Sequence, residues 1–221
     1  MKPSEMLHHV DHTLLAATAT WEEIQKLCDE AIEYQTASVC IPPSYVSRVH
    51  EKYGEQINIC IVVGFPLGYS STAAKKVEIE QGIQDGANEF DMVVNLGYIK
   101  NREYQKVTEE IKELKEVAKD HILKVIIETC YLTEEEKIAM CNAVTEAGAD
   151  YIKTSTGFGT GGATLADVAL FKQNIGSDVK IKAAGGVKNL ADLEAFLTAG
   201  CERIGTSSAV RIIKNQEVNG Y

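Results

Sequence analysis

The sequence has few cysteines and no long hydrophobic run, and each of these shortages excludes a class of protein. The 221 residues include 6 cysteines and 4 prolines. Six cysteines are too few for a disulfide scaffold. Because no C-x-x-C pair occurs among them, a zinc ribbon or a thioredoxin-type site is not expected either. No run reaches the roughly 20 apolar residues of a membrane-spanning helix, and the N-terminus lacks the apolar core of a signal peptide. We therefore expect a soluble, globular protein of the cytoplasm.

Basic residues are also few in comparison with acidic residues. Lysine and arginine number 22 against 32 acidic residues, which gives a net charge of −10. Such a surface repels nucleic acids and anionic membranes, so neither is an expected partner, and any anionic ligand must be held by local cations. The hydrophobic fraction of 45% is high enough to fill a large core and excludes a disordered chain. The expected partner is a small molecule.

Short apolar runs alternate with amphipathic stretches along the whole chain. Eight strands are predicted over 10–15, 36–41, 57–63, 88–95, 122–128, 150–155, 180–186 and 202–208. Eight helices are predicted over 21–34, 44–53, 73–85, 102–119, 133–146, 165–173, 190–198 and 209–214, and Thr133 with Glu136 forms a capping box. Apolar strands separated by helices indicate a parallel sheet covered on both faces, either an open doubly wound sheet or a (β/α)8 barrel. The count of eight, without a linker or a break in composition, favours a single-domain (β/α)8 TIM barrel over residues 1–221.

Three of the charged residues on the predicted strands are the strongest candidates for chemistry. Lys153 lies in YIKTS, Lys182 in KIKAAGG and Asp91 in EFDMVV. A lysine on a buried strand must be paired or desolvated, unless its side chain reaches outward past the sheet. Two such lysines facing one cavity suit Schiff-base chemistry, because desolvation and a neighbouring ammonium both favour the neutral, nucleophilic amine. The carboxylate of Asp91 would carry protons.

Two glycine-containing loops follow the last two predicted strands. Residues 183–188 (AAGGVK) and 204–208 (IGTSS) each end a strand and lead into a helix. In barrels, the loops after the seventh and eighth strands form the usual phosphate site, although two ordinary turns would give the same pattern. Both loops are therefore candidates for binding a phosphate.

Other patterns are weaker. Gly157, Gly159 and Gly162 match the G-x-G-x-x-G fingerprint, but the preceding strand carries a lysine, so a nicotinamide site is not expected. The cluster of His8, His9 and His12 has no recurring acidic partners, so a structural role for His12 is preferred to a metal site. Cys40 ends a strand and is expected to be a buried, inert thiol rather than one facing the barrel mouth.

Five segments together resemble the deoxyribose-phosphate aldolase family. They are DHTLL (11–15), EFDMVV (89–94), YIKTSTGF (151–158), IKAAGGV (181–187) and RIGTSS (203–208), and they occur in order from about residue 10 to residue 213. The resemblance implies a class I aldolase on a (β/α)8 barrel, without a metal or another cofactor. The implied reaction is the reversible cleavage of 2-deoxy-D-ribose 5-phosphate to D-glyceraldehyde 3-phosphate and acetaldehyde. A homo-oligomer is also implied, with a dimer favoured.

The resemblance also implies roles for particular residues. Lys153 matches the Schiff-base lysine, Lys182 the second active-site lysine and Asp91 the proton-relay aspartate. Tyr221, at the end of the polar tail 215–221, matches a terminal tyrosine that can fold over the barrel mouth. Phe158 stands where some family members carry a lysine, and Lys188 is expected to supply the missing charge. The implied substrate- and phosphate-binding residues are Gly157, Gly185, Gly186, Lys188, Gly205, Ser207 and Ser208.

Two alternatives to this function remain. One is another Schiff-base barrel aldolase that acts on a different phosphorylated sugar. The other is a sugar-phosphate-binding protein that has lost catalysis, although binding alone would need neither Lys153 nor Lys182 as a nucleophilic pair.

Overall fold

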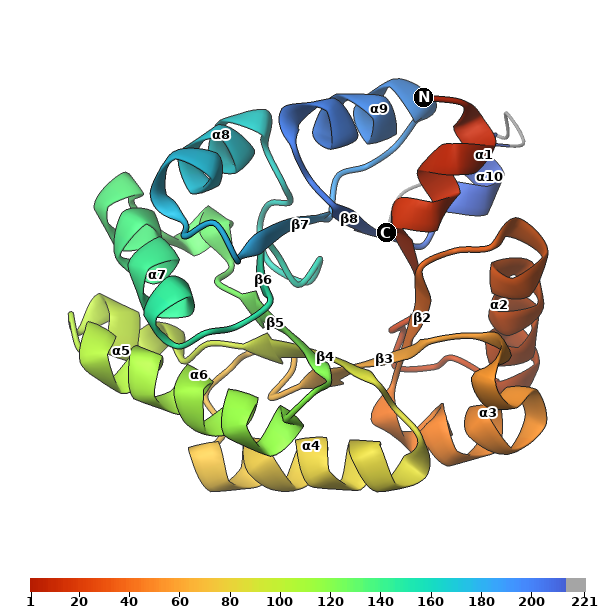
Figure 1. Ribbon diagram of the computed structural model, residues 1–221, viewed down its shortest axis with the longest axis horizontal. Coiled ribbons are helices and arrows are strands. Elements are labelled where there is room, and N and C mark those ends of the chain that lie inside the picture. Colours follow the sequence, from red (N-terminus) through yellow and green to blue (C-terminus); the bar gives the residue numbers. More distant parts are fainter. Residues whose placement is uncertain (214–221) are drawn as a thin grey trace.

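The computed structural model describes residues 1–213, and these form a closed barrel of eight parallel strands. Each strand pairs with the next in sequence, and β8 pairs with β1 to close the ring (Figure 1). This closure confirms the (β/α)8 barrel and excludes the open sheet. The strands are β1 Val10–Thr13, β2 Ser38–Ile41, β3 Ile59–Val63, β4 Glu89–Val93, β5 Ile122–Ile126, β6 Tyr151–Lys153, β7 Lys180–Ala184 and β8 Arg203–Thr206.

The helices form an outer ring around the strands (Figure 1). Their starts follow the capping signals, as in α7, where the Thr133 side chain accepts from the backbone N–H of Glu136. None of the helices described up to residue 213 has the length and hydropathy needed to cross a bilayer. The helices are α1 Pro3–Met6, α2 Trp21–Tyr34, α3 Val46–Tyr53, α4 Thr72–Asp85, α5 Leu96–Lys100, α6 Tyr104–Ala118, α7 Glu134–Glu146, α8 Leu165–Asn174, α9 Leu190–Ala199 and α10 Ala209–Ile213.

The predicted strands are two or three residues longer than the observed ones, and three further comparisons bear on the local structure. α1 and α5 were not predicted, because helices of four and five residues are too short to show helical periodicity. The predicted helix 44–53 begins as a 3-10 turn over Pro43–Tyr45, and the α-helix starts at Val46. Strand β6 ends at Lys153, two residues earlier than predicted, so the chain leaves the sheet directly after this lysine.

The core has two parts of different chemistry. Between the strands and the outer helices, the packing is mainly apolar, with a buried ion pair of Lys75 and Glu110 between α4 and α6. The inside of the barrel instead holds a small cluster of Cys40, Cys60 and Val62, covered by Leu15 and Phe65. It also holds seven buried charged side chains, namely Asp11, Glu89, Asp91, Lys124, Lys153, Lys182 and Arg203. The charged side chains at the barrel centre define the candidate site.

Candidate active site

The structure brings Lys153, Lys182 and Asp91 together inside the barrel. Both ammonium groups donate to the same oxygen, Oδ2 of Asp91, Lys153 at 2.6 Å and Lys182 at 2.5 Å. The two Nζ atoms therefore lie no more than 5.1 Å apart, since each is bonded to one shared atom. Lys153 and Lys182 are also register partners on the adjacent strands β6 and β7. The alternative in which these lysines reach outward past the sheet is wrong.

A second layer of charges lies against this trio. Lys124, on β5, is fully buried and donates to Asp91 Oδ1 at 2.9 Å, while its Nζ also lies 2.6 Å from Glu89 Oε2. Lys182 also pairs with Asp11, whose other oxygen accepts from Arg203 at 2.5 Å. Arg203 in turn pairs with Glu89 at 2.9 Å. The catalytic candidates are thus part of one continuous ion-pair network.

Sequence reasoning missed four members of this network: Asp11, Glu89, Lys124 and Arg203. The signal that singled out Lys153 was present for each of them, because each charge interrupts an apolar strand. Three of them, Asp11, Glu89 and Arg203, were quoted only as parts of the resembling segments DHTLL, EFDMVV and RIGTSS. Their importance follows from closure of the barrel, which brings strands far apart in the sequence within reach of one another.

The network is close to electrically balanced. With every lysine counted as an ammonium, four cations (Lys124, Lys153, Lys182 and Arg203) face the three carboxylates of Asp11, Glu89 and Asp91. Burial alone would raise the pKa of Asp91, but the ammonium groups of Lys124, Lys153 and Lys182 hold it well below its usual range. Burial would lower the pKa of Lys182, but Asp11 and Asp91 keep it raised. Asp91 is therefore held as a carboxylate at rest.

Above this network lies a cavity of about 600 Å³. Lys153 reaches its floor, whereas Asp91 and Lys182 are fully buried beneath it. The cavity is also lined by Thr13, Leu15, Ala184, Val187, Thr206, residues 156–162 and all seven residues expected to bind substrate or phosphate, namely Gly157, Gly185, Gly186, Lys188, Gly205, Ser207 and Ser208. One cavity therefore joins the candidate nucleophile to both glycine-containing loops.

Lys188 and Lys153 are the cationic residues among the described residues that line this cavity. Phe158 lies at the cavity wall with half of its surface exposed, and its ring meets Phe65 edge to face at 5.2 Å. Phe158, at the position where some family members carry a lysine, thus contributes an aromatic surface to the cavity. Lys188 lines the same cavity, where it can supply a positive charge to an anion.

The loop after β6 is fixed by its neighbours. Glu128 is buried and accepts a hydrogen bond from the backbone N–H of Thr156 at 3.1 Å and another from its hydroxyl group. Gly162 packs directly on the backbone of Gly185, where a Cβ atom would lie 2.5 Å from the carbonyl carbon. The glycine run 157–162 is thus the packed wall of a barrel cavity, and it does not form the strand-to-helix turn of a dinucleotide fold.

The weaker patterns have structural explanations. His12 pairs with Glu30 at 2.8 Å outside the barrel interior, as its expected structural role requires. Two groups of potential metal ligands occur within residues 1–213, and neither contains a histidine. Cys40 is buried, with 1% of its surface exposed. Tyr221 and the tail 215–221 lie outside the described residues.

Comparison with known proteins gives the family. The DeoC/LacD family of aldolases matches residues 5–205. The chain is 66% identical to the deoxyribose-phosphate aldolase of Clostridium botulinum (strain Alaska E43 / Type E3) over 100% of both chains, and 57% identical to that of Clostridioides difficile (strain 630) over 98% of this chain and 99% of that one. A tetrameric deoxyribose phosphate aldolase from Aeropyrum pernix superposes with a TM-score of 0.90 at 29% identity, over 97% of this chain and 92% of that one. The chain belongs to the DeoC/LacD aldolase family, and it is an aldolase.

Proposed function

We propose that the protein cleaves 2-deoxy-D-ribose 5-phosphate reversibly into D-glyceraldehyde 3-phosphate and acetaldehyde through a Schiff base on Lys153. One observation carries the proposal: Lys153 is placed at the floor of a cavity whose rim is formed by two glycine-containing loops and Lys188. A phosphorylated sugar fits this arrangement, with its phosphate at the loops on the rim and its aldehyde at Lys153 on the floor. The printed names of the relatives point to the same substrate.

In this mechanism, Lys153 attacks the open-chain C1 aldehyde and, after loss of water, forms an iminium ion. The iminium accepts the electron pair of the C2–C3 bond when the C3 hydroxyl loses its proton, so the reaction needs no metal or other cofactor as an electron sink. Protonation of the resulting enamine and hydrolysis release acetaldehyde and regenerate Lys153.

Asp91 and Lys182 move the protons. Lys182, an ammonium at rest, can give a proton to the reacting oxygen of the substrate, and the proton released by Lys153 can replace it through Asp91 Oδ2, which contacts both amines. Because the pKa of Asp91 is held well below its usual range, the carboxylate passes protons on and does not keep them.

The phosphate is assigned to Gly157, Gly185, Gly186, Lys188, Gly205, Ser207 and Ser208. Gly157, Gly185 and Gly186 have φ values of +87°, +77° and +82°, which turn the backbone in ways that other residues resist. The amide of Ser208 already donates to Thr206 Oγ1, so the Ser208 hydroxyl group is the more available contact. As in the tetrameric relative, we propose a homo-oligomer, with a dimer as the smallest unit.

Borohydride trapping tests the proposal. Reduction in the presence of deoxyribose 5-phosphate should leave a stable added mass on the peptide that contains Lys153. Labelling of Lys182 with Lys153 unmodified would reverse the roles of the two lysines. A coupled assay for acetaldehyde, repeated with fructose bisphosphate, distinguishes the proposed substrate from that of another Schiff-base aldolase. Trapping without any acetaldehyde release would indicate a protein that binds sugars without cleaving them.

A further inference from the structure

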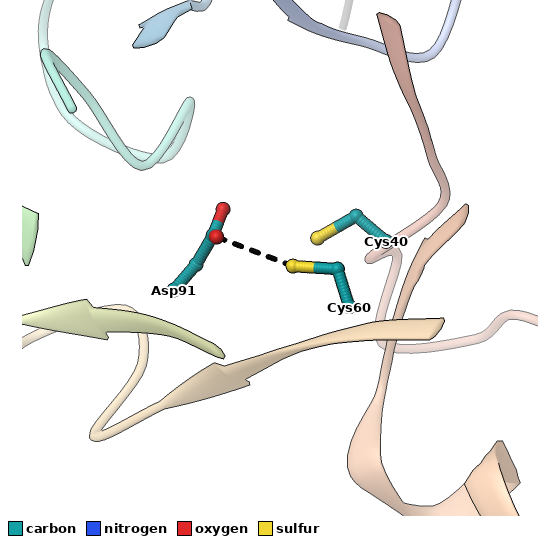
Figure 2. A group of neighbouring side chains, drawn as sticks. All are labelled: Cys40, Cys60 and Asp91. Atoms are coloured by element: carbon teal, nitrogen blue, oxygen red, sulfur yellow. Dashed lines mark hydrogen bonds between the residues drawn. The ribbon is translucent and has the colours of Figure 1, made fainter. Parts of the chain in front are cut away.

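Two thiols face the carboxylate of Asp91 inside the barrel, and the mechanism above uses neither. Cys40 and Cys60 are register partners on β2 and β3, so their side chains leave the sheet side by side. Cys60 Sγ donates to Asp91 Oδ1 at 3.2 Å, and the sulfur of Cys40 points toward the same place (Figure 2). The two sulfur atoms and a carboxylate oxygen of Asp91 all lie within 4.8 Å of one another.

We infer that Cys40, Cys60 and Asp91 form a binding site for a thiophilic divalent cation such as Zn²⁺, and that occupation of this site inhibits the aldolase. Two sulfurs and one carboxylate oxygen are a ligand set that zinc accepts, with a fourth position left for water. In a tetrahedral site, bond lengths of about 2.3 Å to sulfur and 2.1 Å to oxygen separate the sulfur and oxygen by about 3.6 Å. The observed 3.2 Å therefore needs to open by only a few tenths of an ångström.

Charge balance permits the ion to enter this cationic region. Binding replaces the two thiol protons, which leave to solvent, with one divalent ion, so the net charge of the buried network does not change. Lys124 donates to Cys60 Sγ at 3.3 Å and to Asp91 Oδ1 at 2.9 Å, and it must give up both contacts. It keeps a partner in Glu89, whose Oε2 lies 2.6 Å from its Nζ.

The substrate cavity provides the access route. Thr13 and Leu15 line that cavity. Thr13 is the register partner of Cys40, and Leu15 packs on the cluster that contains both cysteines. The side chains of Leu15 and Phe65 cover the thiols, and Leu15 also lines the cavity, so an ion in the cavity must pass this cover to reach them.

Occupation of the site would stop proton transfer. Asp91 Oδ1 would be coordinated to the ion, so the carboxylate could no longer relay protons between the two lysines. This inhibitory part rests on the proposed function, whereas binding of the ion does not. Binding and inhibition are therefore measured separately.

Cd²⁺ is the probe for binding, because a bond from cadmium to a thiolate gives a charge-transfer absorption in the ultraviolet. Titration of the full chain should saturate at one ion per chain. Cys40→Ala and Cys60→Ala should each weaken cadmium binding about tenfold or more. Loss of a group that only hydrogen-bonds to a metal ligand already has an effect of about that size, and here a ligand itself is removed. Cys141→Ala is the matched control: Cys141 is equally buried but lies on α7, in the outer core, and should leave the titration unchanged. Cys130 is the least buried cysteine. If the cadmium–thiolate absorption survived in Cys60→Ala and disappeared in Cys130→Ala, the proposed site would be wrong.

X-ray absorption of the zinc-loaded wild-type protein needs no variant. Two sulfur neighbours at about 2.3 Å are expected, and a shell without sulfur would refute the proposal. Zn²⁺ should also inhibit acetaldehyde release, and EDTA should reverse the inhibition. Cys60→Ala should require about tenfold more zinc for the same inhibition. Tight binding through both thiols without inhibition would overturn the inhibitory role. If the protein showed no cleavage activity at all, the proposed function would be refuted. The cadmium titration would still test whether the ion binds to Cys40 and Cys60.

Discussion

Replacement of Asp91 by asparagine keeps the shape of the side chain and removes its charge from beneath the active site. Asp91 is fully buried and accepts from Lys124, Lys153 and Lys182. The change therefore has two separable effects. It removes the proton carrier between the two catalytic lysines, and it leaves three buried ammonium groups without their shared counter-ion.

The size of each effect can be estimated. Loss of a positioned acid–base group reduces kcat by about 10²–10⁴-fold, which corresponds to about 2.7–5.4 kcal/mol in the barrier. Removal of one partner from a buried ion pair lowers the free energy of unfolding by about 3–5 kcal/mol. For a chain of this length, that loss lowers Tm by about 6–20 °C. The three ammonium contacts predict a marked loss of stability as well.

The assay combines steady-state kinetics with thermal unfolding, and Glu110→Gln is the matched control. Glu110 is buried and pairs with Lys75 at 2.9 Å between α4 and α6, outside the barrel. Both variants should lose stability, but only Asp91→Asn should lose kcat when assayed well below its Tm. Borohydride should still trap Lys153 in Asp91→Asn, because the nucleophile remains. An equal loss of kcat in both variants, or an unchanged kcat in Asp91→Asn, would refute the relay.

Three further predictions rest on the same geometry, and a fourth, on Tyr221, rests on the family resemblance alone. Lys182→Met should lower kcat by about 10²-fold or more, because the proposed proton route through Asp91 loses its second amine; an unchanged kcat would count against a role for Lys182 in proton transfer. Lys188→Met should raise KM for deoxyribose 5-phosphate much more than for unphosphorylated deoxyribose, and equal effects on both would place the phosphate elsewhere. Ion pairs with Lys182, Lys124 and Arg203 hold the pKa of Asp11 below its usual range despite burial, so their stabilisation is present above the unfolded pKa of about 3.9 and is lost as pH falls below it. When the free energy of unfolding is measured with urea at pH 5 and pH 3, Asp11→Asn should therefore lose less of it than the wild-type protein does. Tyr221→Phe should slow exchange of the acetaldehyde methyl protons with solvent while Lys153 still forms its Schiff base, and wild-type exchange in this variant would exclude a role for the phenol.

The order of elements could be predicted from the sequence because each strand and each long helix carries its own periodic signal. α2 was predicted with the bounds it has in the structure, since Thr20 caps its start and the apolar spacing continues to Tyr34. α5 gave no such signal, because its five residues depend on a local cap, in which the Asn95 side chain accepts from the N–H groups of Gly97 and Tyr98. Prediction therefore succeeded where a pattern extended over several turns.

The partners of the charged residues could not be predicted in the same way. Both faces of a strand in this barrel are buried, so an apolar run does not show which face points to the centre. Glu89 and Asp91 are two positions apart and share the inner face, but this is visible only once Lys124 is placed opposite Asp91 in register. The partners of Asp91 come from β5, β6 and β7, and the curvature of the closed sheet brings them together.

In the proposed mechanism, the residues that determine the rate are separate from those that determine the choice of substrate. Lys153, Lys182 and Asp91 project from strands and are held on several sides by ion pairs, so their geometry changes little unless the barrel itself is disturbed. The cavity wall is made mostly of the loops after β6, β7 and β8, in which Lys188 supplies the charge and Phe158 an apolar surface. Substitutions in these loops change contacts to the phosphate or sugar without moving the lysines, so they should act mainly on KM. Substitutions in the ion-pair network should act on kcat and stability together, because the same contacts position the proton relay and balance the buried charge.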